Sequence, residues 1–456
     1  KPKLELNTNS ILAYVADLYV RRHVETVFRD GFLPVAPLKV TDTAREQQRQ
    51  LMVPTNSEER KRLYEIAMLL SPSSGCEKPV LVIGSQAVLH PTLVPEMVKA
   101  IEYLNVPCFL SGMARGLLGS KHPLQYRHER GSALKDCDCV VLCGVSVDFR
   151  LDYGKRIHKK AKLIMVNLSS EKLSQNSDLR KKDITLQADA QIFLIQLAEM
   201  AKQLQIRSDF KNWKKKLAAN EEKKEDKIDA NAKEKSPTSP NSTTFVHPIR
   251  CCRALDQVID EDSFVIADGG DFVGTASYIV RPRKPLRWLD PGAFGTLGCG
   301  AGFAMGVKAL QFQFFFILST QHIRERVVCC ANKNHSPESE VWILFGDGSF
   351  GWSVMELDTF RRMKLPVIAV IGNDACWSQM YRDQIRLFKD PVATELEYTH
   401  YEQVAQGFGC AGILVQNESE LLPSFKKAKE LAKKGTPVVV NVMISKSTFR
   451  EGSISL

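Results

Sequence analysis

The alternation of short apolar segments with helical segments limits the fold of this chain more than any other feature of its sequence. Residues 79–84 and 106–110 are apolar runs, and between them Val98, Ile101 and Leu104 form a stripe at helical spacing. A strand that is buried on both faces of a parallel sheet has this continuous apolar character. Because the alternation runs to about residue 205 and resumes after 247, we predict an α/β chain with two doubly wound parallel-sheet domains.

The 456 residues give room for two or three domains of ordinary size. Residues 206–246 are rich in Lys, Glu, Asn, Ser and Pro, which predicts a polar helix that continues into a flexible linker. The predicted parts are a connector segment at 1–55, a first sheet domain at 56–205, the charged linker at 206–246 and a second sheet domain at 247–456. Within the last, residues 311–336 interrupt the connection between the helix expected at 299–310 and the strand at 341–345, either as an extra loop or as retained non-coding sequence.

The formal net charge is +10, but the basic residues are scattered and interleaved with acidic ones. Nucleic-acid-binding proteins usually concentrate basic side chains on one face. A membrane-spanning helix needs about 20 consecutive apolar residues, and no run in the sequence approaches that length. We therefore expect no nucleic-acid partner and no membrane span within this chain.

The twelve cysteines include no CxxC pair. Cys137, Cys139 and Cys143 lie on or beside an apolar strand, and their spacing predicts that all three face one side of it. Buried free thiols in a reducing compartment explain them better than a metal site does. His128 and His247 lie among polar residues, so we expect both on the surface.

The strongest chemical signal is a pair of strands that end in polar turns. The apolar strand at 341–345 runs into Gly346-Asp347-Gly348-Ser349, and the strand at 366–371 stops just before Asn373 and Asp374. The carboxyl ends of parallel strands meet at one edge of a sheet, where such sheets bind ligands. The glycines admit a close ligand, the following helix N-terminus favours an anion, and the side-chain oxygens suit Mg²⁺. The sequence therefore predicts a diphosphate bridged by a divalent metal at this edge.

The helix after the first of these turns has its own signature. Ser353 and Glu356 have the spacing of a capping box, which predicts that the helix begins beside them. Leu357, Phe360 and Met363 would then face the core.

The two turns together resemble the motif of thiamine diphosphate enzymes, Gly-Asp-Gly followed about two dozen residues later by Asn-Asn. Here Asp374 replaces the second Asn, which keeps an oxygen ligand and adds negative charge. The resemblance implies thiamine diphosphate and Mg²⁺ as cofactors. It also implies Asp347, Asn373 and Asp374 as metal ligands and the backbone carbonyl of Cys376 as a fourth.

Two further stretches resemble cofactor loops of the same family, Asp268 to Gly274 on the other side of the diphosphate and Trp288 to Gly298 under the rings. Leu297 would support the bent cofactor and Gly295 would offer its backbone to the aminopyrimidine. Gln379 is an implied substrate contact. The implied cofactor-binding residues are Asp271, Phe272, Val273, Gly274, Gly295, Thr296, Leu297, Gly346, Gly348 and Ser349.

Four segments resemble in sequence the acetolactate synthase-like, 2-hydroxyacyl-CoA lyase branch of the family. They are residues 112–119, 268–275, 287–297 and 449–454. This implies cleavage of a 2-hydroxyacyl-CoA into formyl-CoA and a shortened aldehyde; acetolactate-type carboligation of 2-keto acids is the alternative. The central domain holds FAD in acetolactate synthases and contacts the nucleotide of acyl-CoA in the lyases, and no adenine signature decides between them. Arg115 and Arg127 could meet a CoA phosphate or be ordinary surface residues.

In this family an amino-terminal domain carries the glutamate that activates the cofactor, and we find no such domain in the sequence. We therefore expect this chain alone to be inactive, which leaves a non-catalytic cofactor-binding fragment or subunit as another alternative. The resemblance further implies a homodimer or tetramer. It implies attachment to the endoplasmic reticulum through a segment upstream of this chain, or otherwise a cytoplasmic location.

Overall fold

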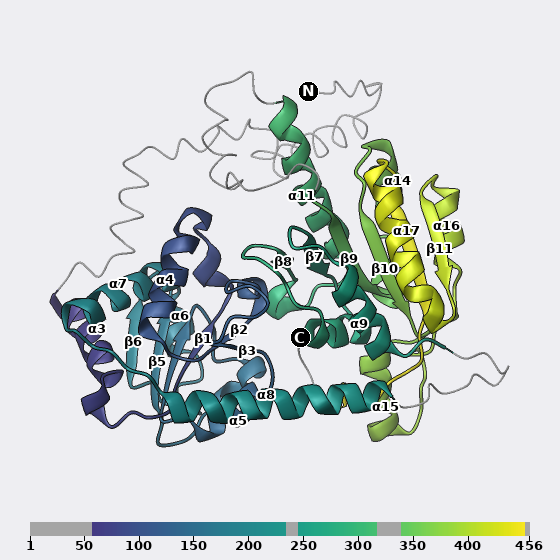
Figure 1. Ribbon diagram of the computed structural model, residues 1–456. Coiled ribbons are helices and arrows are strands. Elements are labelled where there is room, and N and C mark those ends of the chain that lie inside the picture. Colours follow the sequence, from purple (N-terminus) through teal and green to yellow (C-terminus); the bar gives the residue numbers. More distant parts are fainter. Residues whose placement is uncertain (1–56, 234–244, 317–338, 452–456) are drawn as a thin grey trace, which may run out of the picture. The chain divides into compact units, whose positions relative to one another are not determined.

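The computed structural model describes residues 57–233, 245–316 and 339–451 (Figure 1). The predicted connector at 1–55 lies outside these residues, as does most of the predicted insertion at 311–336. Within the described parts, no helix is long and apolar enough to cross a membrane.

The first half of the described chain forms one parallel sheet with the strand order β3-β2-β1-β4-β5-β6. Its strands are β1 (Pro79–Ile83), β2 (Cys108–Leu110), β3 (Gln125–Tyr126), β4 (Cys139–Cys143), β5 (Lys162–Asn167) and β6 (Ile184–Gln187). Its helices are α3 (Ser57–Leu69), α4 (Val94–Leu104), α5 (Arg130–Asp136), α6 (Ser170–Ser174) and α7 (Ala190–Gln203). The predicted doubly wound sheet is confirmed.

The second half forms another parallel sheet with the order β11-β12-β10-β9-β7-β8. Its strands are β7 (Phe264–Ala267), β8 (Trp288–Leu289), β9 (Val341–Gly346), β10 (Ile368–Asn373), β11 (Ala411–Val415) and β12 (Val438–Met443). Its helices are α9 (Pro248–Val258), α10 (Asp271–Ile279), α11 (Cys299–Phe316), α13 (Asp347–Gly351), α14 (Glu356–Arg362), α15 (Ser378–Phe388), α16 (Tyr401–Gly407) and α17 (Leu421–Lys433). This second doubly wound sheet also confirms the prediction.

The central strands β1, β4, β9 and β10 are buried along their whole length, as helices on both faces require. In the first sheet Cys139 and Cys143 belong to the apolar cluster on one face, whereas Cys137 belongs to the cluster on the other. The prediction that all three share a face is wrong, because β4 begins only at Cys139 and Cys137 is the C-cap residue of α5. Burial raises the pKa of the Cys143 thiol, in keeping with an inert core residue.

A long helix, α8 (Lys211–Ala232), occupies much of the segment that was predicted as a charged linker (Figure 1). The predicted polar helix is confirmed, but it is not solvated all round, since Trp213, Leu217 and Ile228 are buried. The indole N–H of Trp213 donates to the carbonyl of Pro79 over 3.0 Å. Residues 234–244 of the predicted linker lie outside the described residues, and the domain boundaries themselves stay predictions.

The helix that follows the Gly-Asp-Gly turn begins differently from the prediction. Residues 347–351 already form the short helix α13, and α14 begins at Glu356 without a side-chain cap. The Ser353 hydroxyl is buried and has no hydrogen-bond partner among the described residues. The predicted capping box is therefore wrong. Leu357 and Phe360 are buried as expected, but Met363 is 58% exposed.

Candidate cofactor and metal site

Asp347 lies where β9 ends, directly beside the end of β10. The strand register places Gly346 opposite Gly372, so the polar turns after the two strands meet at one edge. The Asp347 side chain is buried, and its two oxygens accept hydrogen bonds from the backbone N–H groups of Gly348 (2.8 Å) and Cys376 (3.1 Å). One carboxylate therefore ties both turns together.

Asp374 adds a second buried carboxylate to this edge. Burial raises the pKa of Asp347 to about 6. Burial, with the charge of Asp347 as the next cause, raises the pKa of Asp374 to about 8. Two neighbouring carboxylates in a poorly solvated place need either protons or a cation to offset their charge. A hard divalent cation such as Mg²⁺ fits this donor set.

Asn373 has structural partners that the sequence could not show. Its amide nitrogen donates to the carbonyl of Thr399 (3.1 Å) and to Oδ1 of Asn441 (3.3 Å), and its own oxygen accepts from the N–H of Ala375 (3.3 Å). These bonds hold the turn in shape. The Asn373 oxygen keeps a second lone pair, so its role as a metal ligand stays a prediction beside those of Asp347, Asp374 and the backbone carbonyl of Cys376.

Glycines at the ends of β7 and β9 bring two backbone turns very close together. The N–H of Gly346 donates to the carbonyl of Gly269 over 3.0 Å, and the hydroxyl of Ser349 lies 2.9 Å from the same carbonyl. Gly270 has φ 104°, a conformation that favours glycine, and α10 begins directly after it. A β-carbon on Gly348 would lie 2.5 Å from the Trp377 ring, so a larger residue does not fit there.

The loop predicted to lie under the cofactor rings is fixed by Asp268, a fully buried residue. Its carboxylate oxygens accept the N–H groups of Gly298 (2.9 Å) and Gly300 (2.6 Å). Leu297 packs onto Gly269, where an added β-carbon would lie 2.2 Å from its Cδ2 atom. Gly295 and Thr296 are exposed beside it. A flat ring system could therefore rest on Leu297.

The predicted site residues fall into two groups. The structure brings together Asp271, Gly346, Asp347, Gly348, Ser349, Asp374 and Cys376. In contrast, Phe272 and Val273 are buried in the core of the second sheet, so only their backbones could face a ligand. Gly274 lies against the guanidinium of Arg450, 2.6 Å from where its β-carbon would be.

We call the turns that carry Gly269, Gly270, Asp347 and Asp374 the cofactor cradle. A cavity of about 250 Å³ is lined by Gly269, Gly270, Leu297 and the predicted substrate contact Gln379, among other residues. A larger cavity of about 520 Å³ shares four lining residues with it. The shared residues are Arg115, Phe149, Arg150 and Arg450. The two cavities therefore border each other, and one extended molecule could occupy both.

The larger cavity is strongly basic. Arg115 and Arg127 line it rather than lying free on the surface, and each donates to a backbone carbonyl of α10, Ser277 and Tyr278 respectively, over 2.6 Å. Burial lowers the pKa of Arg127 to about 10, which still leaves it charged at neutral pH. Three acidic side chains, Glu129, Asp152 and Glu451, line the cavity against eight cationic ones. The cations are Arg115, Arg127, Arg130, Lys135, Arg150, Arg156, Lys224 and Arg450.

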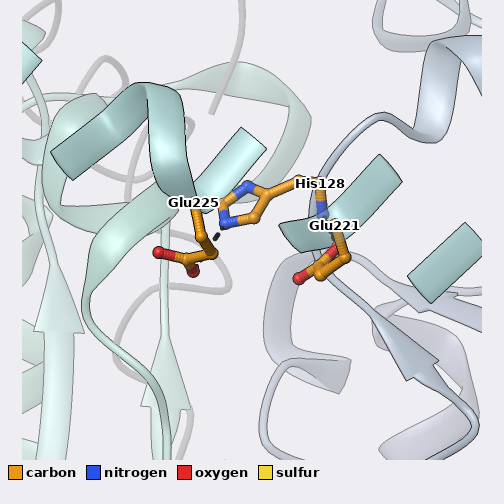
Figure 2. Close-up of side chains that lie close together, drawn as sticks. All are labelled: His128, Glu221 and Glu225. Atoms are coloured by element: carbon orange, nitrogen blue, oxygen red, sulfur yellow. Dashed lines mark hydrogen bonds and ion pairs between the residues drawn. The ribbon is translucent and has the colours of Figure 1, made fainter. Parts of the chain in front are cut away.

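Figure 2 shows a second polar cluster, formed by His128 with Glu221 and Glu225 of α8. Its ligand-type atoms lie within 4.8 Å of one another. The His128 side chain is fully buried, with Nε2 3.0 Å from Glu225, so the prediction that it lies on the surface is wrong. The surface prediction for His247 is also wrong: its ring caps α9 by accepting the N–H of Ile249.

The carboxylates of this second cluster already have other partners. Glu221 accepts the backbone N–H groups of Arg127 (3.1 Å) and His128 (2.8 Å), and Arg253 lies 2.6 Å from Glu225. The bonds from His128, then from Arg253, lower the pKa of Glu225 to about 2. This arrangement fastens α8 to its neighbours through ion pairs and does not require a metal.

Sequence reasoning missed two residues that shape the main site, namely Ser378 and Arg382. It placed Asp268 in a cofactor loop but did not predict that its carboxylate fixes the loop at Gly298 and Gly300. Ser378, which donates to Asp374, begins α15. Arg382 reaches Asp271 from more than a hundred residues along the chain, a contact that no local pattern indicates.

Two domain families, both from the same group of enzymes, match this chain. Residues 66–197 match "Thiamine pyrophosphate enzyme, central domain", and residues 268–442 match "Thiamine pyrophosphate enzyme, C-terminal TPP binding domain". The chain belongs to the thiamine pyrophosphate enzymes. Thiamine pyrophosphate is another name for thiamine diphosphate, so the resemblance inferred from the strand-end turns is confirmed. The matched C-terminal range includes Asp271, Asp347 and Asp374, the residues that the structure gathers at one edge.

Curated relatives refine this assignment. The chain is 44% identical over 386 residues to "2-hydroxyacyl-CoA lyase 2" of Danio rerio, covering 84% of this chain and 57% of that protein. It is 40% identical to the protein of the same name in Caenorhabditis elegans, covering 99% of this chain and 64% of that protein. It is 29% identical to "Acetolactate synthase large subunit IlvG" of Mycobacterium tuberculosis, covering 82% and 60%. The chain spans less than two thirds of the length of each of these relatives.

Proposed function

We propose that this protein is a thiamine diphosphate- and Mg²⁺-dependent lyase that cleaves a 2-hydroxyacyl-CoA into formyl-CoA and a shortened aldehyde. The observation that carries the proposal is the pairing of two cavities, one beside the cofactor cradle and one lined by arginines. The relatives named 2-hydroxyacyl-CoA lyase 2 support it.

The two cavities suit the two ends of an acyl-CoA. A reactive acyl head fits the smaller cavity, which borders Leu297 and Gln379. The phosphates of a CoA tail fit the larger one, because guanidinium groups bind phosphate oxygens through paired, charge-assisted hydrogen bonds. The 2-keto acids of acetolactate-type carboligation are small and carry no phosphate, so as substrates they give no role to the eight cationic side chains, although the diphosphate of FAD would. The identity to the relatives named 2-hydroxyacyl-CoA lyase 2, 44% and 40%, is higher than the 29% to the acetolactate synthase, and this favours the lyase over the carboligase.

Each residue of the cradle has a proposed task. Asp347, Asp374 and the Cys376 carbonyl would hold Mg²⁺, while the turn at Gly269 and Gly270 and the N-terminus of α10 would receive the diphosphate. When bound, thiamine diphosphate supplies the nucleophilic carbon and the electron sink for carbon–carbon bond cleavage. Leu297 would support its rings, and the Gln379 amide would orient the polar head of the substrate.

Binding of the tail can be tested apart from turnover. Arg156 lines the large cavity and is 55% exposed, so it can be replaced without disturbing the core. We expect Arg156→Gln to weaken CoA binding about tenfold, the loss of one charge-assisted contact, and to leave pantetheine binding unchanged. Calorimetry with both ligands measures this, and Lys160→Gln, at an exposed residue outside the cavity lining, is the matched control.

Two results would contradict the proposal. One is equal affinity of the unsubstituted chain for CoA and pantetheine, which would leave the arginine cavity without a phosphate to bind. The other is formation of acetolactate from pyruvate with no formyl-CoA from 2-hydroxyacyl-CoA, measured by mass spectrometry of the products. FAD binding, the homodimer or tetramer, the endoplasmic reticulum location and the inactivity of this chain alone stay predictions.

A further inference from the structure

Arg382 on α15 makes an ion pair with Asp271, the first residue of α10. Nη2 of Arg382 lies 2.5 Å from Oδ1 of Asp271. The two side chains are 19% and 8% exposed, so the pair lies largely out of water. It joins α10, whose preceding turn is expected to hold the diphosphate, to α15, which follows the expected metal ligands Asp374 and Cys376.

The pair lies at the acidic edge already described. Ser378, which lies four residues before Arg382 on α15, donates to Asp374. Residues four apart on a helix lie one above the other on the same face, so Arg382 lies one turn along α15 from this contact. Lys446 is another cation that acts on Asp374.

Asp271 by itself would oppose the binding of an anion. The N-terminus of α10 attracts negative charge, but a carboxylate at the first helical residue already occupies that favourable field. Arg382 neutralises this carboxylate. The field of the helix and its N–H groups then remain available for a diphosphate.

The second nitrogen of the same guanidinium is also informative. Nη1 of Arg382 is buried and has no hydrogen-bond partner among the described residues. A buried donor without an acceptor is costly, and such groups in native proteins usually have a partner when the protein is in its working state. The planar guanidinium can hold a carboxylate with one nitrogen and a phosphate oxygen with another.

We propose that Arg382 is a ligand of the cofactor diphosphate, and that Asp271 holds its guanidinium in position for that contact. The inference rests on the family's cofactor and on the proposed diphosphate cradle, and it does not depend on acyl-CoA as the substrate. It gives the site a cationic ligand in addition to Mg²⁺.

The test measures binding of two probes to the full chain in the presence of Mg²⁺, thiamine diphosphate and inorganic diphosphate. We expect Arg382→Gln to weaken both about tenfold to a hundredfold, the range for a lost charge-assisted hydrogen bond, as measured by calorimetry. Arg382→Lys should retain part of the affinity, because lysine keeps the positive charge but lacks the paired N–H donors of the guanidinium. Arg386→Gln, on the exposed face of the same helix, should bind both probes like the unsubstituted chain.

The Asp271→Asn variant distinguishes two roles of Arg382, a ligand of the diphosphate and a purely structural partner of Asp271. If Arg382 binds the diphosphate, Asp271→Asn should lose less affinity than Arg382→Gln, because it retains the cation and removes a competing anion. Equal or greater loss in Asp271→Asn would overturn the proposal, as would unchanged binding of inorganic diphosphate by Arg382→Gln. Failure of the unsubstituted chain to bind inorganic diphosphate would also overturn it. A missing lyase activity would leave all these results unchanged, so the two proposals fail separately.

Discussion

At the residue scale, Asp374 is the most unusual member of the site. The resemblance predicts asparagine there, whereas this chain adds a second buried carboxylate whose pKa is raised to about 8, mainly by burial. A proton or a divalent cation can offset that charge, so metal binding and protonation compete for the same oxygens. The affinity for Mg²⁺ should therefore increase as the pH rises from about 6 to about 8.

The same carboxylate should make the metal-free chain sensitive to pH. The pKa of Asp374 is higher in the folded state than the ordinary value near 4 of the unfolded state. The stability it contributes is therefore complete below about pH 4 and is lost as the pH rises toward 8. We expect Asp374→Asn to flatten the decline of the melting temperature between pH 6 and 8 when a chelator is present.

Melting curves of both proteins across this pH range, with chelator and with Mg²⁺, provide the measurement. Mg²⁺ should offset the decline in the unsubstituted chain and have less effect in Asp374→Asn. Parallel curves for the two proteins with chelator present would show that Asp374 does not titrate in this range.

Residue-scale prediction from sequence worked where a strand end determined the position. Asp347 and Asp374 each follow an apolar strand, so their convergence followed from the topology of a parallel sheet. The contacts of Asn373 with Thr399 and Asn441 depend on segments 26 and 68 residues away, and no local spacing indicates them. The same distance along the chain concealed the pairing of Arg382 with Asp271.

At the element scale, α8 shows how a helix can be predicted correctly and its environment missed. Its many Lys and Glu residues suggested a solvated helix. However, Trp213, Leu217 and Ile228 are separated by intervals of 4 and 11, which place them on one helical face. Short strands such as β3 and β8 were missed because two residues carry no periodicity, and only their pairing partners define them.

The buried face of α8 can be tested by truncation. Trp213→Ala removes a large buried ring and its hydrogen bond to Pro79, and we expect it to lower the free energy of unfolding by about 3–5 kcal/mol. Lys215→Ala, exposed on the same helix, should change it by less than about 0.5 kcal/mol. Urea unfolding of the three proteins measures both effects, and a Trp213→Ala curve that overlays the unsubstituted one would show that α8 is not part of the core.

At the scale of the whole molecule, both parallel sheets followed from the alternation of strands and helices. The apolar runs at β1, β4, β9 and β10 are fully buried, and this is why they were visible in the sequence. The basic cavity was not predictable, since its cations come from segments of both sheets and from α8. Their convergence depends on tertiary contacts that composition does not encode.

The central claim is that the edge formed by Asp347, Asp374 and the Cys376 carbonyl holds Mg²⁺ and, through it, thiamine diphosphate. Calorimetric titration of the chain with thiamine diphosphate, with and without Mg²⁺, tests it most directly. We predict binding only when Mg²⁺ is present, loss of that binding in Asp347→Ala, and no change in Asp358→Ala, whose side chain is 57% exposed on α14. Equal binding by Asp347→Ala and the unsubstituted chain would contradict the account.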